Sequence, residues 1–401
     1  MGGMTPVETR ERVVTLDVLR GFALLGVLIA NLFVLYSLRF TLRDKEPTGG
    51  LLDAVAVWFL RIAVESKAQT LLTCLFGFGF AAQLLRAHER GQHVVPIYVR
   101  RLFTLLAIGW FHVLFLSWVD VTWGYALTGF FLLLFLRCSN RTRLIFAFAF
   151  TIIPAAIYAI PAVRPALHHL MFDSPPGKYI ADYAAAAHSG DRLAILRTHA
   201  VLGVMWTLGG GVAWYLPWLL GRFLLGYVAG VQRWFERDGA DHLGLFRKLL
   251  VFGALAALPA TILHVLVDTG TFAPRAHGLP LAMAAAVIVQ LGLLGQVAMY
   301  VALVVMLMQR PGWRTVLGVL APVGRMPLTT YLMQSLLCTS LFYGWGLDWH
   351  TPSPAACVGL AFAIFTVQIA IAHLWLRWFR FGPAEWVWRS VVYLHPQPMR
   401  S

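Results

Sequence analysis

Residues 281–308 read LAMAAAVIVQLGLLGQVAMYVALVVMLM, an apolar run without a charged side chain. A helix needs about 20 mostly apolar residues to cross the roughly 30 Å of hydrocarbon in a bilayer. This run is long enough to span a membrane as a helix. The fold class therefore depends on how often such runs recur along the chain.

Comparable runs recur from one end of the chain to the other. The 401 residues are 59% hydrophobic and 12% charged, about half the roughly 25% charge of a typical soluble domain. We predict an all-α fold, a polytopic transmembrane helix bundle that forms a single membrane-embedded domain over residues 1–401. The predicted spans, about ten, are 16–38, 68–86, 102–118, 121–136, 144–162, 215–231, 247–267, 281–308, 327–344 and 355–375.

The basic residues predict how the bundle is oriented. Short cytoplasmic segments of membrane proteins carry an excess of Lys and Arg, and with the N-terminus inside every inner segment is basic. We therefore expect an N-in/C-in topology, with residues 377–401 as a cytoplasmic tail. The inner basic residues are Arg10, Arg12, Arg20, Arg86, Arg90, Arg100, Arg101, Arg137, Arg141, Arg143, Arg233, Arg237, Arg247, Lys248, Arg310, Arg314, Arg377, Arg380, Arg389 and Arg400.

This placement also explains the formal net charge of +14 without a nucleic-acid partner. The arginines sit in short segments beside apolar spans, where they set topology and meet lipid headgroups. No polybasic tract or RNA-binding signature accompanies them. The four cysteines lack paired spacing, so we expect neither a disulfide nor a metal site.

Two stretches depart from the pattern of simple spans. Residues 51–66 (LLDAVAVWFLRIAVES) are apolar but interrupted by Asp53, Arg61 and Glu65, which favours an interfacial or re-entrant helix on the outer side. Residues 163–214 form the longest outer segment. Its Pro and Gly punctuation predicts a loop, and its length predicts a lid or a substrate-contact region.

Polar side chains inside predicted spans are candidate functional residues, because each costs a few kcal/mol in hydrocarbon (~2.5–3.5 kcal/mol for a charge). Arg20 and Asn31 lie eleven residues apart, which places them on one helix face about 16 Å apart in depth. Arg20 could clamp a phosphate bidentately at the cytoplasmic mouth. Alternatively, Arg20 sets topology and Asn31 hydrogen-bonds a neighbouring helix.

His112 is a candidate general base, since histidine titrates near neutrality. Asp120 marks the outer turn after it and could orient the imidazole. Contact between the two requires the chain to turn back after His112, because eight residues of continuous helix would separate them by about 12 Å. The alternative is a buried histidine bonded to a backbone carbonyl.

A third candidate segment begins at Arg325. Thr330, Tyr331, Gln334 and Ser335 form a polar stripe at helical spacing, which suits either helix packing or the wall of a polar cavity. Three further residues could line the same cavity. They are Arg222, which needs a carboxylate or phosphate partner at membrane depth, and the rim residues Glu65 and Lys67.

These residues carry a resemblance to a known family. The sequence resembles the YeiB-like bacterial membrane proteins, a family long labelled as of unknown function, over nearly the full chain. The matching motifs, in order, are Arg12-x-x-Thr15-Leu16-Asp17 with Arg20-Gly21-Phe22 through Asn31, Glu65-x-Lys67 with Leu75-Phe76-Gly77-Phe78-Gly79, His112 with Asp120 and Tyr125, Gly324-Arg325-Met326-x-Leu328-Thr329-x-Tyr331-Leu332-x-Gln334-Ser335, and Gly382-Pro383-x-Glu385-Trp386-x-Trp388-Arg389.

The resemblance implies membership in the transmembrane acyltransferase superfamily, with the bacterial sugar O-acyltransferases and the lysosomal heparan glucosaminide acetyltransferase. The Arg20-x10-Asn31 spacing is similar to the Arg-x10-His motif of the O-acyltransferases, with asparagine in place of histidine. The lysosomal enzyme also has asparagine there, followed shortly by a catalytic histidine. This chain departs from that pattern, because no histidine occurs between Asn31 and His88.

The activity implied is transfer of an acyl group, such as acetyl, from cytoplasmic acyl-CoA to an extracytoplasmic glycan or lipid at the bacterial inner membrane. Arg20 and Arg325 would hold CoA phosphates, His112 with Asp120 would deprotonate the acceptor, and Asn31 would donate a hydrogen bond to the oxyanion. A transporter or flippase and a structural assembly partner stay open as alternatives. The expected partners are membrane lipids and the acceptor, with a homodimer among the open oligomeric states.

Overall fold

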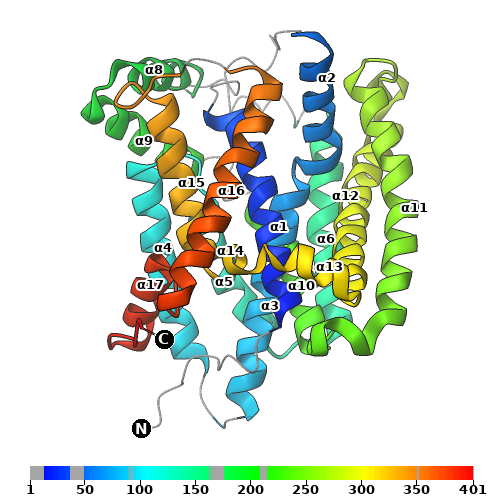
Figure 1. The fold of residues 1–401 in the computed structure, drawn as a ribbon. Helices are drawn as coiled ribbons and strands as arrows, with labels where there is room; N and C mark the ends of the chain where they lie inside the picture. Colours follow the sequence, from blue (N-terminus) through cyan, green and yellow to red (C-terminus); the bar gives the residue numbers. More distant parts are fainter. Residues whose placement is uncertain are drawn as a thin grey trace.

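The structure is a computed structural model that describes residues 13–36, 49–89, 94–161, 176–207, 215–349 and 352–400, together with the single residues 91 and 163. Helices make up nearly all of this part of the chain. The β-bridge between Phe379 and Arg400 is isolated and belongs to no strand. The predicted all-α class is confirmed (Figure 1).

The described elements are almost all helices. In chain order they are α1 (Val14–Asn31), η2 (Leu32–Tyr36), α2 (Gly50–Phe59), η4 (Leu60–Val64), α3 (Lys67–Glu89), α4 (Val94–Phe115), α5 (Thr122–Leu132), η5 (Leu133–Phe135), α6 (Asn140–Ala159), α8 (Pro176–Ser189), α9 (Arg192–Trp206), α10 (Leu216–Val231), η8 (Glu236–His242), α11 (Leu243–Asp268), η9 (Pro274–His277), α12 (Leu279–Met308), α13 (Pro311–Gly318), α14 (Ala321–Arg325), α15 (Pro327–Phe342), α16 (Pro354–Trp378) and α17 (Pro383–Tyr393).

Each predicted span coincides with one of these helices. Within the described residues, seven helical runs are long and apolar enough to cross a membrane. They are Val14–Tyr36, Gly50–Glu89, Val95–Phe115, Asn140–Ala159, Glu236–Asp268, Leu279–Met308 and Pro354–Trp378. The chain is therefore a membrane protein with several apolar helices.

The start of α1 and the whole of α17 lie at one end of the bundle, here called the terminal end, and α8 and α9 lie at the opposite end (Figure 1).

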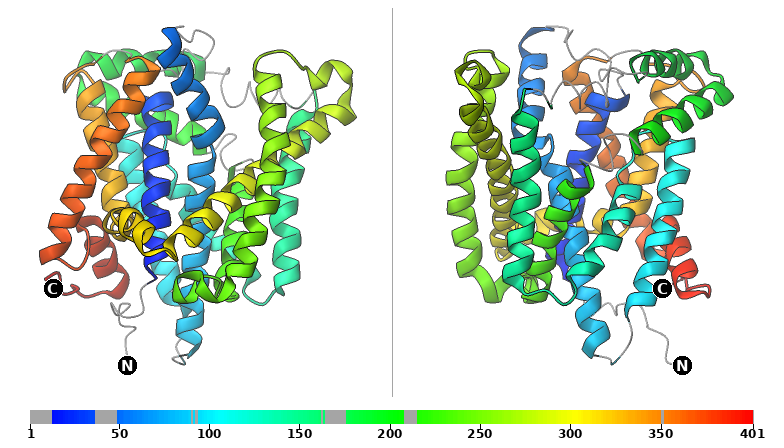
Figure 2. Two further views of the ribbon diagram at one scale, coloured as in Figure 1. Left: turned by 45° about the vertical axis from the view of Figure 1, so that its right-hand side comes forward. Right: turned by 180° about the vertical axis from the view of Figure 1, so that it is seen from behind.

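Helix α1 runs through the middle of the bundle, and both views of Figure 2 show other helices around it. Two glycines let the short helix α14 approach it closely. A Cβ on Gly21 would lie 2.5 Å from the Leu320 carbonyl oxygen, and a Cβ on Gly324 would lie 1.8 Å from that of Asp17. Neither position can carry a larger side chain without moving α14 away from α1. This contact holds Arg20 and Arg325 on adjoining elements.

Residues 51–66, expected to be an interfacial or re-entrant helix, form α2 and η4. These two elements stand along the bundle above α3 and pack beside α16 (Figure 1). Asp53 is buried because its Oδ1 accepts the backbone N–H of Ala355 at 2.9 Å, in the first turn of α16. A carboxylate at a helix N-terminus offsets the unpaired N–H groups there. The charge that suggested an interfacial helix therefore caps a neighbouring helix.

A loop was expected over residues 163–214, but this segment contains two helices, α8 and α9. They lie across the end of the bundle opposite the terminal end (Figure 1). Asp191 separates them and caps α9, accepting the N–H groups of Leu193 and Ala194 at 2.8 and 3.2 Å. The glycine triplet at 209–211 and the residues around His168 lie outside the described residues.

Candidate functional site

His112 is the centre of a buried polar cluster between α4, α15 and the turn that follows α4. Its side chain is 1% exposed. Nε2 lies 2.7 Å from Oγ of Ser335, and Nδ1 lies 3.3 Å from Oδ1 of Asp120. The ring stacks on Tyr331 with the centroids 4.9 Å apart. One imidazole thus contacts a carboxylate on one side and a hydroxyl on the other.

The chain turns back after α4 to bring Asp120 to His112, as contact between them requires. The turn fits against α4 because Gly109 has no side chain: a Cβ there would lie 2.6 Å from the Trp123 nitrogen and 3.0 Å from Oδ2 of Asp120. A larger residue at position 109 would push the Asp120 turn off the helix. The glycine therefore holds the carboxylate beside the imidazole.

The Asp120 carboxylate is fixed by donors on both oxygens. Oδ2 accepts the backbone N–H groups of Thr122 and Trp123 at 2.7 and 3.0 Å and the Thr122 hydroxyl at 2.5 Å. Oδ1 accepts the Tyr331 hydroxyl at 3.1 Å and faces Nδ1 of His112. Nδ1 is the ring nitrogen that faces a carboxylate oxygen, which can only accept, so we assign the imidazole proton to Nδ1. Nε2 is then the basic nitrogen, and it faces Ser335.

A second polar group from the α8–α9 end adjoins this centre, and the sequence analysis did not single it out. His199 of α9 is fully buried, donating through Nδ1 to the Leu114 carbonyl at 3.2 Å and accepting the Tyr343 hydroxyl at Nε2, 3.4 Å away. Tyr343 also hydrogen-bonds Tyr183 of α8 at 2.8 Å. Burial lowers the pKa of His199 to about 4, with a smaller lowering from nearby His112.

Arg20 and Arg325 lie on adjoining elements at the terminal end, where Arg20 pairs with Asp17 at 2.9 Å. Two further arginines, Arg101 and Arg389, lie nearby and were not selected by the sequence analysis. Arg101 of α4 is close enough to Arg20 and Arg389 to be repelled by their like charges. Its guanidinium lies 4.2 Å from the Trp388 ring. The Arg101 Nε is buried and makes no hydrogen bond to any described residue. Like charges gathered in this way attract an anion.

Glu385 explains why the Gly-Pro-x-Glu motif follows the last long helix. From α17 it reaches the N-terminus of α15, where Oε1 accepts the N–H groups of Leu328 and Thr329 at 2.6 and 3.1 Å. Oε2 accepts the Thr329 hydroxyl at 2.5 Å. Burial raises the pKa of Glu385, and these hydrogen bonds oppose the rise. Glu385 caps α15 and so fixes the helix that carries Tyr331 and Ser335.

Other candidates from the sequence lie away from His112. Gln334 donates from α15 to the Leu24 carbonyl of α1 at 3.4 Å and to Gln368 of α16 at 3.2 Å, and so connects three helices. Asn31 ends α1. Among the described residues, the contacts of His112 and Asp120 do not include the Asn31 side chain. Lys67 donates to the Arg61 carbonyl at 2.6 Å, and the adjoining Glu65 is its charge partner.

Arg222 is fully buried, and the described groups that accept its hydrogen bonds are uncharged. It donates to the Trp218 carbonyl at 3.0 Å, to Gln290 at 3.1 Å and to Thr70 at 3.5 Å. Its guanidinium also lies 3.6 Å from the Trp218 ring centroid. No described carboxylate pairs with it. Uncharged acceptors and a ring face therefore surround this cation.

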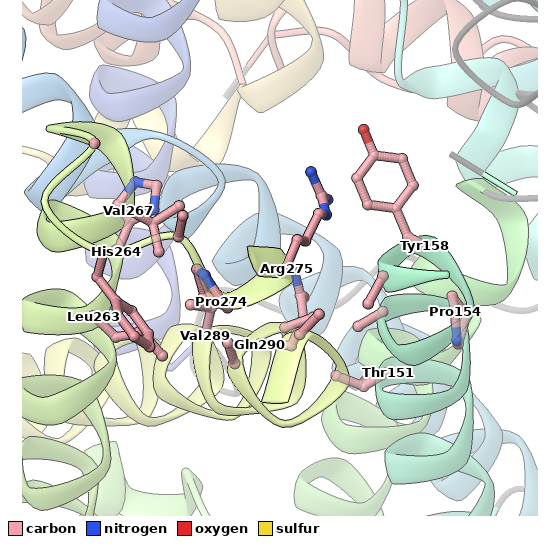
Figure 3. A pocket seen from close by; sticks show the side chains of 18 of the residues that line it. Thr151, Pro154, Tyr158, Leu263, His264, Val267, Pro274, Arg275, Val289 and Gln290 are labelled. Atoms are coloured by element: carbon pink, nitrogen blue, oxygen red, sulfur yellow. The ribbon is translucent and has the colours of Figure 1, made fainter. Parts of the chain in front are cut away.

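Gln290 and Trp218 also line a cavity of about 600 Å³ between α6, α11, η9 and α12. In Figure 3 the side chains of Arg275 and Tyr158 extend in the same direction from η9 and α6, and most of the remaining lining residues are apolar. Arg222 thus lies directly beside the cavity through Gln290. The cavity shares no lining residue with the His112 cluster.

Among the described residues no group of three or more His, Cys, Asp or Glu side chains could hold a metal ion. At His112 the side chains present supply an imidazole, a carboxylate and a hydroxyl. A histidine held between a carboxylate and a hydroxyl can accept a proton from that hydroxyl and return it. It can also accept a proton from a second hydroxyl that lies beside the first. That is the proton transfer that acyl transfer requires.

Comparisons with known proteins agree with the resemblance in the sequence. Residues 229–395 match the family model described as "Protein of unknown function (DUF418)". The uncharacterized protein YxaH of Bacillus subtilis (strain 168) is 33% identical over 100% of this chain and 98% of its own length. The uncharacterized protein YeiB of Escherichia coli (strain K12) is 27% identical over 95% of this chain and 96% of its own. No solved structure matches.

Proposed function

The chain belongs to the YeiB-like family, and from the geometry of its buried centre we propose that it is a membrane-bound acyltransferase. It takes an acyl group, such as acetyl, from acyl-CoA at the terminal end, which faces the bacterial cytoplasm. It delivers that group to a glycan or lipid hydroxyl from the opposite side of the inner membrane. The observation that carries the proposal is His112 held between Asp120 and a hydroxyl, at 3.3 and 2.7 Å.

The roles follow from the positions of the groups. Nε2 of His112 accepts the proton of a reacting hydroxyl, and Asp120 keeps the imidazole in the required tautomer and stabilises the imidazolium that forms. Tyr331 holds Asp120 in turn. Burial of the whole cluster keeps water from competing with the acceptor for an activated acyl group.

The arginines of the terminal end supply the donor site. Arg20, Arg101 and Arg325 lie where the phosphates of CoA would arrive from the cytoplasm. Arg325 ends α14, and Ser335 lies eight residues beyond Pro327, the first residue of α15, a rise of about 12 Å along that helix. An extended pantetheine arm bridges a separation of this order, so phosphates held by the arginines would leave the thioester near His112.

The proposal predicts that acyl-CoA binds from one side only. Labelled acetyl-CoA should bind to inside-out membrane vesicles that contain the protein and not to sealed right-side-out vesicles. Vesicles without the protein are the control. Absence of binding in both orientations would reject the acyltransferase assignment.

A transporter or flippase is the second candidate, favoured by the cavity beside Arg222. A buried cation next to a largely apolar cavity suits an amphipathic anion, such as a lipid with an acidic headgroup. The two functions predict opposite results for Arg222→Gln. Transport of such a lipid would fall in this variant, whereas acetyl-CoA binding and acyl transfer at His112 would be unchanged.

A further inference from the structure

Ser335 completes an arrangement of three side chains drawn from three separate parts of the chain. Its Oγ lies 2.7 Å from Nε2 of His112, whose Nδ1 faces Asp120 at 3.3 Å. We infer that Ser335 is a nucleophile that carries the acyl group as a covalent ester between donor and acceptor. The inference rests on the proposed function for the donor, and the nucleophile itself can be tested without it.

The connectivity is that of a serine nucleophile activated by histidine and aspartate. In such sites the carboxylate binds Nδ1–H, and Nε2 accepts the serine proton. Here the donors on Oδ2 of Asp120 leave Oδ1 facing Nδ1. The tautomer that satisfies Asp120 therefore presents a basic Nε2 to the Ser335 hydroxyl.

The contact with His112 is also the best hydrogen bond available to Ser335. The alternative within α15 is to the Tyr331 carbonyl, four residues back, at 3.4 Å. That bond is long for a hydroxyl donor, for which about 2.7–2.8 Å is usual.

The reaction divides into two balanced halves. In the first, Oγ of Ser335 attacks the thioester carbonyl while its proton passes to Nε2 of His112. The C–S bond then breaks, and the CoA thiolate takes that proton and leaves as free CoA, so that Ser335 becomes an ester. In the second half, an acceptor hydroxyl gives its proton to Nε2 and attacks the ester carbonyl. The C–O bond to Ser335 breaks, and Oγ takes the proton back.

The first experiment looks for the ester directly. Purified full-length protein is incubated with acetyl-CoA without acceptor, denatured in acid, and analysed by intact-protein and peptide mass spectrometry. We expect one acetyl group on the peptide that contains Ser335. It should be absent from Ser335→Ala and His112→Gln, and Ser335→Cys should carry a thioester that neutral hydroxylamine removes. Ser340→Ala, at a half-buried serine on the same helix, is the matched control.

Transfer rates test the same inference, since Ser335 and His112 should act as a unit. Each of Ser335→Ala and His112→Gln should lower transfer by at least about 10³-fold, and the double variant should be no slower than either. Transfer at the wild-type rate by Ser335→Ala, without an adduct on the wild type, would overturn the inference and leave the proposed function standing.

A fluorophosphonate probe separates the two proposals, because it reacts with an activated serine without any CoA. Labelling of Ser335 in wild type but not in His112→Gln supports the nucleophile. If this labelling occurs while acetyl-CoA neither binds nor acylates the protein, Ser335 is a nucleophile and the proposed donor is wrong. If neither reagent modifies Ser335 in folded protein, the inference fails. Size-exclusion profiles and melting temperatures show that each variant is folded.

Discussion

The behaviour of single residues here depends on partners that lie far away along the chain. His112 and Ser335 are 223 residues apart and lie 2.7 Å from each other. The sequence indicated that His112 and Asp120 could meet if the chain turned back, and Gly109 shows why the turn fits. The sequence placed Ser335 in a polar stripe but could not show that His112 faces this stripe. Helical periodicity shows which residues share one face of a helix, and it does not show which helix packs against that face.

The same limit applies to the charged residues. The anion expected beside Arg222 stays a prediction, and the sequence did not indicate that Thr70, Trp218 and Gln290, from three different helices, accept its hydrogen bonds. Arg101 was counted only as a topology residue. Its closeness to Arg20 and Arg389 depends on how α1, α4 and α17 pack, which composition cannot report.

His112→Gln tests the proton transfer at the residue level. Glutamine keeps a hydrogen-bonding group of similar reach but cannot accept a proton, so acyl transfer should be lost while acetyl-CoA affinity stays within about twofold of wild type. Turnover with purified protein and equilibrium binding are the two measurements. His373→Gln, on the exposed side of α16, is the control. Near-normal turnover of His112→Gln would reduce His112 to a structural role.

Arg20 and Arg325 should contribute separately to acyl-CoA affinity. A charge-assisted contact with a phosphate contributes about 1.5–3 kcal/mol, so Arg20→Ala and Arg325→Ala should each weaken acetyl-CoA binding roughly ten- to a hundredfold. Lysine should restore only part of the affinity, because it lacks the planar fork. Arg310→Ala is the control for loss of one charge at the same end. Wild-type affinity in all four Arg20 and Arg325 variants would contradict the donor site.

At the scale of elements, hydropathy predicted the helices well, since each apolar run became one. It does not show which element a polar residue serves. Asp53 was one reason to expect an interfacial helix over residues 51–66, and the structure shows that its carboxylate caps α16. Pro and Gly around 163–214 suggested a loop, although α8 and α9 lie within it. A side chain that caps another helix makes a tertiary contact, and no local sequence pattern predicts such a contact.

His199 should make the packing of α9 sensitive to acid. Its folded-state pKa of about 4 lies below the usual 6.5, so the unfolded chain binds the proton more readily. The contribution of His199 to the free energy of unfolding is therefore highest above pH 6.5. It falls as the pH drops from 6.5 towards 4, and then levels off. The full loss is about 3 kcal/mol.

Thermal unfolding in detergent between pH 7.5 and 4.5 measures this loss. His199→Gln has no proton to gain, so its melting temperature should fall less over this range than that of wild type. His395→Gln, on an exposed histidine near the C-terminus, should retain the wild-type slope. Equal pH slopes for wild type and His199→Gln would show that another group causes the acid sensitivity.

At the scale of the whole molecule, the placement of basic residues predicts which end faces the cytoplasm. Reporter fusions after residues 95, 140, 240 and 312 should report the cytoplasm, and fusions after 46, 185 and 273 the outer side. The structure is consistent with this arrangement, since the start of α1 and α17 share one end (Figure 1). An outer-side signal at 140 or 240 would overturn the orientation, and with it the side from which acyl-CoA is expected to enter.

The central claim, acyl transfer to an envelope acceptor, is tested most directly by comparing acylated glycans and lipids from cells with and without the gene by mass spectrometry. The account predicts at least one acyl ester that is lost on deletion, restored by the wild-type gene and not restored by His112→Gln. The His112→Gln protein should be present in the membrane at the wild-type level. Identical acylation in all four strains would contradict the claim.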